Sequence, residues 1–442
     1  MAKITSTGKN NFQKYDVVVI GGGPSGMMAA GRAAELGARV LLVEKNETLG
    51  NKLLMTGGGR CNVTQAEFDD KKLVAKIGQK GKFLFSSLSL FGPEDMLEFL
   101  AERKVPTKIE ADGRVFPVSD KAMDVLRALK NYLQKNKVEI SLGTAVLGFE
   151  FSEDSDGKRI VGVRLADKII RAKKFILATG GASYPTTGST GDGYQWACEC
   201  GHKIITPMPM LVPIKIQEKW VKEVQGVSLE NVKVSLLQRR DAINRVFTDH
   251  VLMGDIIFTH FGLSGPAILN LSRNLTELEN SQDKFGISID LKPEMDRKEL
   301  DALLQKAFIK YANKDIINYL PELLPPKLAK VILRLADIPE EKKINVITKF
   351  ERTKLVNLLK DLRLTVIGNT GFDQAMVTRG GVDLVEVEPK TMRSKIVTNL
   401  YLAGEVLDLD GPTGGYNLQI CWSTGYAAGT ACVGKNKISL NI

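Results

Sequence analysis

The chain begins with a repeating order of apolar and mixed segments. Residues 15–20, YDVVVI, form a short apolar run rich in β-branched side chains, which predicts a buried strand. GGGPSG follows, then MMAAGRAAELG with helical composition, and then the apolar run ARVLLVEK. A strand, a helix and a second strand within about 30 residues indicate a parallel pair joined by a crossover helix. The first part of the chain is therefore predicted to be an α/β domain.

The next 150 residues continue this mixed pattern. Spaced apolar positions predict helices over 94–104 and 120–136. The segments EISLGTAVLGFEF, RIVGVRLA and KIIRAKKFILATGG are each predicted to be strands.

The second half of the chain changes character and then returns to the first pattern. Residues 207–290 are mostly β in pattern, and 296–360 form charged helical segments interrupted by LPELLPPK. β patterning returns over 362–380, and 399–433 is typical of a strand, a glycine-rich loop and a helix. Because this last unit resembles cofactor-binding machinery and 207–370 does not, we predict a nucleotide-binding domain split by a large insertion.

Charge and hydropathy narrow the class of protein. Lysine and arginine number 61 against 51 acidic residues, a net charge of +10. Such a surplus can attract nucleic acid, but dispersed lysines are more typical of a solubility feature, and we expect no nucleic-acid partner. No apolar run approaches the roughly 18 residues of a membrane helix, and the N-terminus lacks the apolar segment of a secretory signal. We therefore expect a cytoplasmic protein with no membrane contact; the sequence does not indicate its oligomeric state.

The five cysteines indicate neither a disulfide framework nor a metal centre. Their number is odd, and no CxxC pair occurs. Cys198 and Cys200 have the wrong spacing for a usual zinc half-site, and only His202 lies nearby. No metal site is predicted.

The turn after the first strand carries a dinucleotide fingerprint. In GxGxxG, Gly21 permits the tight turn, Gly23 lets a pyrophosphate approach the backbone, and Gly26 lets helix and strand pack closely. The helix that follows presents its N-terminus to the phosphates. Glu44 ends the second strand, where an acid accepts hydrogen bonds from a ribose diol. Since Glu44 would repel a 2′-phosphate, NADP is disfavoured at this position, but the fingerprint alone does not separate NAD from FAD.

Three further glycine-rich loops favour FAD. They are TGGGRCN at 56–62, ATGGASYPTTGSTGDG at 178–193 and LAGEVLDLDGPTGGYN at 402–417. An NAD dehydrogenase needs one such loop, whereas the longer FAD needs backbone on several sides of its ring system. Glu405 is placed to bind the ribityl chain, and the helix from Tyr416 could direct its N-terminus at the flavin N1–O2 edge.

These motifs together resemble the HI0933-like family of FAD-dependent oxidoreductases, which includes aminoacetone oxidases and bile-acid dehydrogenase-like reductases. The resemblance rests on GGGPSGMMAA, TGGGRCN, GRVFP, ATGGASYPTTGSTGDGY, FTHFGLSGPAIL and LAGEVLDLDGPTGGYNLQ, and covers nearly all of the chain after residue 14. It implies an α/β fold in which a Rossmann-like FAD/NAD(P)-binding domain is split by a small β-barrel that itself carries a small helical domain. The implied boundaries are a tail at 1–14, the FAD domain at 15–206 and 375–442, the barrel at 207–294 and 361–374, and the helical insert at 295–360.

The resemblance also assigns the cofactor contacts. It makes Gly57–Asn62 a flavin-contacting loop, and the alternative of a redox thiol is weak because Cys61 has no partner cysteine in its segment. Lys52, in NKL, stands where the family often has arginine, so a phosphate contact there departs from the family pattern. The predicted contacts to non-covalently bound FAD are Gly21, Gly23, Pro24, Ser25, Gly26, Glu44, Lys45, Lys52, Gly57, Gly58, Gly59, Arg60, Cys61, Asn62, Val146, Ala178, Thr179, Gly180, Gly181, Gly193, Gly404, Glu405, Gly414, Gly415, Tyr416, Asn417 and Leu418.

Candidate catalytic residues are few. His260 in FTHFGLSGP is a candidate acid or base, Arg114 in GRVFP could bind a carboxylate or carbonyl, and Tyr184 in GGASYP could line the flavin. Each has an alternative: a histidine capping a turn, a hairpin arginine and a packing tyrosine. Asp192 and Asp408 could simply brace the glycine loops.

Three functions remain open at this stage. The first is hydride transfer between flavin N5 and a small organic substrate. Because no second GxGxxG occurs, NAD(P)H would bind only transiently, or oxygen would be the other redox partner. The second is a flavoenzyme acting on RNA, and the third is a non-catalytic FAD-binding protein.

Overall fold

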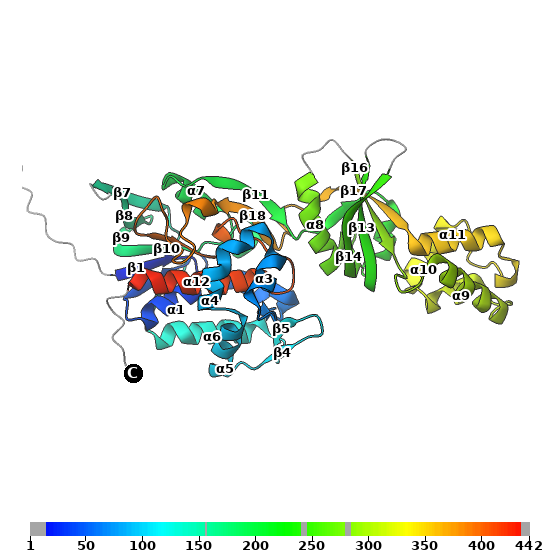
Figure 1. Cartoon of the computed structure of the whole chain (residues 1–442), viewed down its shortest axis with the longest axis horizontal. Coiled ribbons are helices and arrows are strands. Elements are labelled where there is room, and N and C mark those ends of the chain that lie inside the picture. The colour runs from blue at the N-terminus through cyan, green and yellow to red at the C-terminus, as the bar shows by residue number, and fades with distance from the viewer. Residues whose placement is uncertain (1–14, 155–156, 240–244, 279–283, 435–442) are drawn as a thin grey trace, which may run out of the picture. The chain divides into compact units, whose positions relative to one another are not determined.

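The computed structural model describes residues 15–154, 157–239, 245–278 and 284–434. The chain divides into two compact units, Met1–Met208 with Val377–Ile442, and Pro209–Met376. Figure 1 labels the elements of both units.

The first unit is built on a five-stranded parallel sheet in the order β19-β10-β1-β2-β6. Its strands are β1 (Tyr15–Ile20), β2 (Val40–Val43), β6 (Glu139–Ser141), β10 (Ala172–Leu177) and β19 (Leu400–Leu402). Ile20 pairs with both Val43 and Leu177, so three neighbouring strands end at the same level. The loops that follow them therefore meet at one edge of the sheet, where parallel α/β sheets bind ligands.

Two helices far apart in the sequence pack together on this sheet. In Figure 1, α12 (Tyr416–Val433) lies beside α1 (Pro24–Glu35). A Cβ on Gly425 would lie 2.5 Å from Ser25 O, and one on Gly429 would lie 2.5 Å from Ala29 O. These two glycines therefore bring the backbones of α1 and α12 into contact.

Smaller elements complete this unit. The helices are α2 (Asn51–Met55), α3 (Asp70–Ile77), α4 (Phe85–Leu90), α5 (Pro93–Glu102), α6 (Ala122–Lys135) and α7 (Asp192–Glu199). The strands are β3 (Thr64–Gln65), β4 (Thr107–Ile109), β5 (Arg114–Pro117), β7 (Gly148–Asp154), β8 (Gly157–Arg164), β9 (Ile169–Ile170), β11 (Ile204–Met210) and β18 (Val377–Val382). They form the small sheets β3-β5-β4, β7-β8-β9 and β11-β18.

The predicted helices in this half are confirmed as α5 and α6, but two predicted strands are wrong. KIIRAKKFILATGG forms β9 and β10, which belong to different sheets. EISLGTAVLGFEF forms β6 and the start of β7, not a single strand. Gly143 at φ +59° and Gly148 at φ +138° adopt backbone conformations that interrupt an extended chain.

The second unit contains a closed six-stranded barrel in the order β12-β15-β14-β13-β16-β17. Its strands are β12 (Ile214–Ile216), β13 (Ser228–Arg239), β14 (Arg245–Phe258), β15 (Gly262–Ser264), β16 (Lys284–Asp290) and β17 (Leu362–Asn369). Alternate residues such as Val232, Val234 and Leu236 are buried, as expected for a filled barrel interior. Its helices are α8 (Pro266–Leu278), α9 (Arg297–Lys310), α10 (Pro326–Leu335) and α11 (Lys349–Lys360). The predicted fold class, a Rossmann-type sheet with a barrel and helices, is confirmed.

His202, in the segment that also contains Cys198 and Cys200, is held by hydrogen bonds within the protein. The buried His202 ring bonds to Glu386 through Nδ1 at 3.0 Å and to Ser394 Oγ through Nε2 at 2.8 Å. Burial lowers the pKa of His202, although Glu386 opposes the shift. Among the described residues no cluster of histidine, cysteine and acidic side chains could hold a metal ion, and none of the described helices has the length and apolarity to cross a membrane.

Candidate functional site: a cradle at the carboxyl edge of the parallel sheet

The three fingerprint glycines have different surroundings. Gly21 has φ +106°, and a Cβ there would lie 2.4 Å from Ala178 O. A Cβ on Gly26 would lie 1.8 Å from Gly21 O, so the turn and α1 can approach only when neither residue has a side chain. At Gly23, by contrast, a Cβ would meet no atom within 4 Å. Gly21 and Gly26 therefore serve the packing of the chain, and Gly23 lies against open space.

The N-terminus of α1 begins at this open position. Gly23 is the N-cap residue, Pro24 follows it, and no side chain caps the helix. Ser25 Oγ instead lies 3.4 Å from Ala403 O, so its side chain contacts the loop after β19. An uncapped first turn presents backbone N–H groups and the positive end of the helix dipole, which suit a phosphate.

Glu44 is held by the chain at the end of β2. Its Oε2 accepts from Gly22 N at 2.6 Å, and its Oε1 accepts from Asn46 N at 2.9 Å and Asn46 Nδ2 at 2.8 Å. Asn46 Nδ2 also donates to Thr187 O at 3.1 Å, which ties the acid-bearing strand to the loop before α7. The two bonds from Asn46 use both lone pairs of Oε1, whereas Oε2 keeps one lone pair for a ribose hydroxyl. The sequence analysis did not include Asn46, although a polar residue two positions after the acid is a usable signal.

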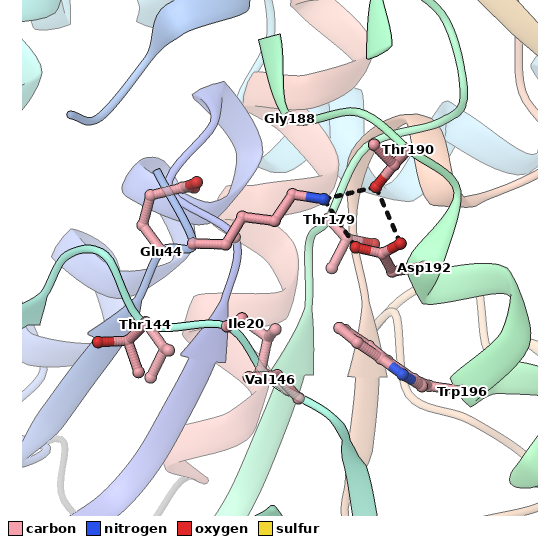
Figure 2. Close-up of a pocket in the computed structure, with 13 residues that line it drawn as sticks. Ile20, Glu44, Thr144, Val146, Thr179, Gly188, Thr190, Asp192 and Trp196 are labelled. Atoms are coloured by element: carbon pink, nitrogen blue, oxygen red, sulfur yellow. Dashed lines mark hydrogen bonds and ion pairs between the residues drawn. The ribbon is translucent and has the colours of Figure 1, made fainter. Parts of the chain in front are cut away.

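A pocket lies beside Glu44 at the ends of β1, β2 and β10 (Figure 2). The predicted contacts Gly21, Glu44, Lys45, Val146 and Thr179 all line it. Its other lining residues are Ile20, Val43, Thr144, Ala145, Gly188, Thr190, Asp192 and Trp196. One part of the wall is therefore apolar and the rest is polar, as a pocket for a base and its ribose requires.

Lys45 is one of the residues that line the pocket. Its Nζ lies 2.5 Å from Thr190 Oγ1 and 2.7 Å from Asp192 Oδ2. Burial alone would raise the pKa of Asp192, but Lys45 and Thr190 outweigh it and the pKa is lowered. Asp192 therefore fastens the 184–192 loop to β2 through Lys45, consistent with the bracing role considered for it.

Three observations test whether these residues fit an adenine dinucleotide. Thr179 Oγ1 is buried among the pocket residues and has no hydrogen-bond partner within the described chain. The backbone at Gly23 is open, and α1 is uncapped. A buried hydroxyl without a partner is costly unless a ligand satisfies it. The residues present fit the group: the pocket suits adenosine, and the start of α1 suits the pyrophosphate.

The loop Gly57–Asn62 has an unusual backbone. Gly57, Gly58 and Gly59 have φ of 56°, 66° and 87°, and Cys61 also has a positive φ of 64°. Cys61 is fully buried, and burial raises the pKa of its thiol to about 12. Because the thiolate is the reactive form, burial acts against the redox alternative for this cysteine.

Asn62 connects this loop to two other segments. In the amide orientation that satisfies its surroundings, Nδ2 donates to Thr64 O and to Val115 O, and Oδ1 accepts from Gly415 N at 3.0 Å. Gly415 is the N-cap of α12, and a Cβ there would lie 2.3 Å from Thr64 C. Asn62 therefore positions the start of α12 against the glycine loop.

The remaining residues at the start of α12 have structural partners. Asn417 bonds to Gly411 N at 2.8 Å and to Gly411 O at 2.9 Å, which closes the loop before the helix. Tyr416 and Leu418 are buried. Gly414 has φ +116°, so it also serves the turn. No side chain caps α12, and its N-terminus keeps the properties expected of a flavin-facing helix end.

Arg60 is directed at the β4–β5 hairpin and its flanks. Its guanidinium lies 2.5 Å from Glu110, 2.7 Å from Asp120 and 3.8 Å from the centre of the Phe116 ring. The hydrogen bonds to Glu110 and Asp120 raise the pKa of Arg60. The three glycines have no side chains that could hold the loop in place. Arg60 holds the loop instead, through its contacts to residues outside it. The direct FAD contact predicted for Arg60 stays a prediction, and within the described chain its side chain positions the loop.

Replacing Arg60 with methionine is expected to weaken FAD binding about tenfold, because the loop loses two ion pairs while the side chain still covers Phe116. The FAD dissociation constant from fluorescence titration measures this, and the melting temperature should change little. Lys108→Met is the matched control, since Lys108 pairs with Asp120 at 2.5 Å without being part of the loop. Equal FAD affinity in the Arg60 variant and the wild type would contradict the anchoring role.

Lys52 and Glu405 form the centre of a second polar cluster. Lys52 Nζ lies 2.7 Å from Glu405 Oε2 and 2.6 Å from Ser183 Oγ. Glu405 Oε1 accepts from Ser183 Oγ and from Thr378 N, each at 2.8 Å. Thr378 Oγ1 in turn accepts from Ala182 N and Ser183 N. The cluster joins α2, the loop after β10, β18 and the turn at Gly404–Val406. Ser183 lies within the motif at 178–193 but was not predicted as a contact, and no motif contained Thr378.

The other predicted glycines serve close approaches in the same region. A Cβ on Gly181 would lie 2.5 Å from Thr378 Oγ1, and one on Gly193 would lie 2.0 Å from Thr179 Oγ1. Gly404 at φ +77° has Ser25 Oγ 2.4 Å from its Cβ position. Gly180 has φ +75°, and Ala178 N donates to Ile20 O at 2.9 Å. These residues shape the loops around the cradle.

The three candidate catalytic residues belong to different elements, Arg114 and Tyr184 in the first unit and His260 in the second. Arg114 pairs with Asp112 at 2.5 Å and Glu110 at 3.5 Å on the β5 hairpin. Tyr184 has φ +51°, a conformation that is strained for tyrosine, and burial raises its pKa. His260 belongs to the barrel unit, in the turn between β14 and β15, where it is exposed and its ring centre lies 4.9 Å from that of Phe261. Asp408 accepts from Gly380 N at 3.0 Å and pairs with Lys80, which agrees with a bracing role.

Comparison with known proteins gives consistent results over the whole chain. The model of the HI0933-like protein Rossmann domain matches residues 15–431. A 3-dehydro-bile acid delta(4,6)-reductase of Clostridium scindens is 33% identical, over 93% of this chain and 98% of that protein. A ribosomal RNA dihydrouridine synthase of Escherichia coli is 31% identical, over 94% of this chain and 97% of that protein. The structure of a flavocytochrome c3 fumarate reductase covers 95% of this chain and 78% of that one, with a TM-score of 0.51 and 16% identity, which supports the fold.

Proposed function

This chain belongs to the HI0933-like family and is an FAD-dependent oxidoreductase, and from that premise we propose that it reduces a carbon–carbon double bond conjugated to a carbonyl group. The three relatives matched over nearly their whole length carry names that describe hydrogen addition, one a delta(4,6)-reductase and two dihydrouridine synthases. A 3-keto-4-ene and the C5–C6 bond of uridine are both alkenes conjugated to a carbonyl group. A common reaction class accounts for two such different substrates in one family.

The observation that carries the cofactor assignment is the cradle of α1, Glu44 and Thr179. The start of α1, Glu44 and Thr179 would hold FAD non-covalently, and the bound group would supply hydride transfer between a transiently bound NAD(P)H and the electron-poor carbon of the alkene. The chain lacks a second GxGxxG, so we propose that the nicotinamide donor binds without a Rossmann domain of its own.

The protein side chains would orient the substrate and supply a proton. We propose that Arg114 polarises the substrate carbonyl, which draws electron density from the double bond. The second alkene carbon needs a proton after hydride addition. Tyr184 is the proposed donor, because it lies in a motif of the family and in the same unit as the cradle.

We propose two substrate classes, in order of preference. The first is a small organic enone, in keeping with the bile-acid reductase. The second is a uridine within RNA, favoured by the ribosomal RNA dihydrouridine synthases of Escherichia coli and Haemophilus influenzae, at 31% and 32% identity, together with the net charge of +10.

Anaerobic stopped-flow absorbance at the flavin band tests the reaction. We expect NADH or NADPH to bleach the flavin, and a 3-keto-4-ene steroid or unmodified ribosomal RNA to restore the oxidised spectrum with formation of the saturated product. Protein that cannot be loaded with FAD would overturn the cofactor assignment. Bleaching by a small amine, with reoxidation by air and no response to either nicotinamide, would overturn the reductase proposal in favour of an oxidase.

A further inference from the structure

The outer faces of α9 and α11 combine exposed apolar side chains with lysines. On α9, Leu300, Leu304 and Phe308 are buried at helical spacing, so the opposite face turns to solvent. Ile309 is 81% exposed there, beside the exposed Lys306 and Lys310. On α11, Phe350 is 69% exposed beside the exposed Lys349. Ile309 and Phe350 are among the most exposed large apolar side chains of the described residues.

The two helices and the turns beside them form one structural feature. Asn345 N donates to Ala312 O, and Ile344 N donates to Lys314 O, both at 3.0 Å. Arg352 of α11 pairs with Asp301 of α9 at 2.7 Å. The contacts 312–345 and 301–352 run in opposite directions, so the helices are antiparallel, and Figure 1 shows them side by side. We call residues 306–315 and 342–354 the insert tip.

The insert tip concentrates positive charge. It holds eight lysine or arginine residues against two acidic ones. Lys342, Lys343, Arg352 and Lys354 are neutralised locally by Glu351, Asp315, Asp301 and Asp337. Within the described part of the chain, Lys306, Lys310, Lys314 and Lys349 form no ion pair with a carboxylate, and all four are exposed. Lys310 and Lys314 instead flank the Tyr311 ring, at 5.0 and 4.4 Å from its centre.

We propose that the insert tip binds RNA. Exposed lysines without carboxylate partners suit phosphates, because each contact releases a condensed counterion. Phe350 is exposed next to Lys349, and Lys354 Nζ lies 5.0 Å from the centre of its ring. An unstacked base could lie on this ring while the lysines bind the adjoining backbone. An acidic protein partner would use the charges but gives no comparable reason for aromatic exposure. The inference rests on the second proposed function, a uridine within RNA.

The charge component is tested by replacing three lysines. Lys306, Lys310 and Lys349 are changed together to glutamine in the full-length, FAD-loaded protein. The control changes Lys72, Lys130 and Lys135, which are exposed on α3 and α6 and remove the same charge. Binding to deproteinised bacterial ribosomal RNA is measured by fluorescence anisotropy at several salt concentrations. Each lost phosphate contact should lower the slope of log affinity against log salt by roughly 0.7–0.9, so we expect the tip variant to lower it by about 2. The control variant should leave the slope unchanged.

The stacking component is tested by one residue. Phe350→Ala should weaken RNA binding about tenfold with an unchanged salt slope. Phe68→Ala is the control, because Phe68 is also exposed, at 52%, but belongs to the other unit. Equal losses in tip and control variants, or capture of ribosomal proteins without RNA, would overturn the proposal.

Flavin reduction by nicotinamide is measured on the same variants. It should match the wild type in all of them, because the tip contains none of the cofactor-binding residues. A tip that binds RNA in a protein whose flavin no donor reduces would leave this inference standing and the reductase proposal overturned. Normal turnover of a steroid enone by a protein that does not bind RNA would overturn this inference and leave the reductase proposal standing.

Discussion

Gly23→Ala is expected to give a folded protein that binds little FAD. The backbone of Gly23 has φ −79°, which alanine adopts readily, and a Cβ there would meet no protein atom within 4 Å. The methyl group would instead stand where a pyrophosphate approaches the start of α1. We expect the melting temperature to stay within a few degrees and the FAD dissociation constant to rise about 100-fold.

Gly26→Ala separates this effect from simple damage to the fold. Its Cβ would lie 1.8 Å from Gly21 O, so α1 and the turn would have to move apart. We expect a loss of about 3 kcal/mol or more in the free energy of unfolding, together with loss of flavin. Thermal melting and the ratio of flavin to protein absorbance measure both variants. A yellow Gly23→Ala protein with native FAD affinity would contradict the placement of the pyrophosphate at this turn.

Breaking the Lys52–Glu405 ion pair is expected to lower the free energy of unfolding, and this is the second largest effect predicted here. The two side chains are only 21% and 14% exposed, and removing one leaves the other partly buried without its counter-charge. Lys52→Met and Glu405→Gln should each lower the free energy of unfolding by about 2 kcal/mol. The double variant should cost less than the sum, with a coupling of about 1 kcal/mol or more.

An exposed ion pair provides the control for this cycle. Arg334 and Glu223 also meet at 2.8 Å, but their side chains are 56% and 52% exposed. Arg334→Met should cost at most about 1 kcal/mol, because water screens the pair. Denaturant unfolding of the four proteins in the Lys52–Glu405 cycle measures the coupling. Strictly additive losses would show that Lys52 and Glu405 contribute independently, and the cluster would not act as one unit.

Local sequence patterns predicted the core of the first unit well. The strand YDVVVI and the helix after GGGPSG appear as β1 and α1, because β-branched runs and glycine turns act within a few residues. Glu44 and Thr179 were predicted to contact the cofactor, and both line the pocket at the ends of β2 and β10. Their proximity follows from parallel strands that end at the same level. EISLGTAVLGFEF was predicted as one strand because its apolar content hid two glycine turns.

Tertiary structure alone decided which polar side chains meet. Arg60 pairs with the hairpin around Phe116, and the Glu405 carboxylate meets Lys52, 353 residues away in the chain. Ser183 and Thr378 come together across 195 residues, and α12 settles on α1 through Gly425 and Gly429. Hydrophobic periodicity reports which face of an element is buried, and glycine motifs report where the backbone must turn. Neither carries information on the partner of a charged group, because the folded chain sets that partner by bringing distant segments to the same edge of one sheet.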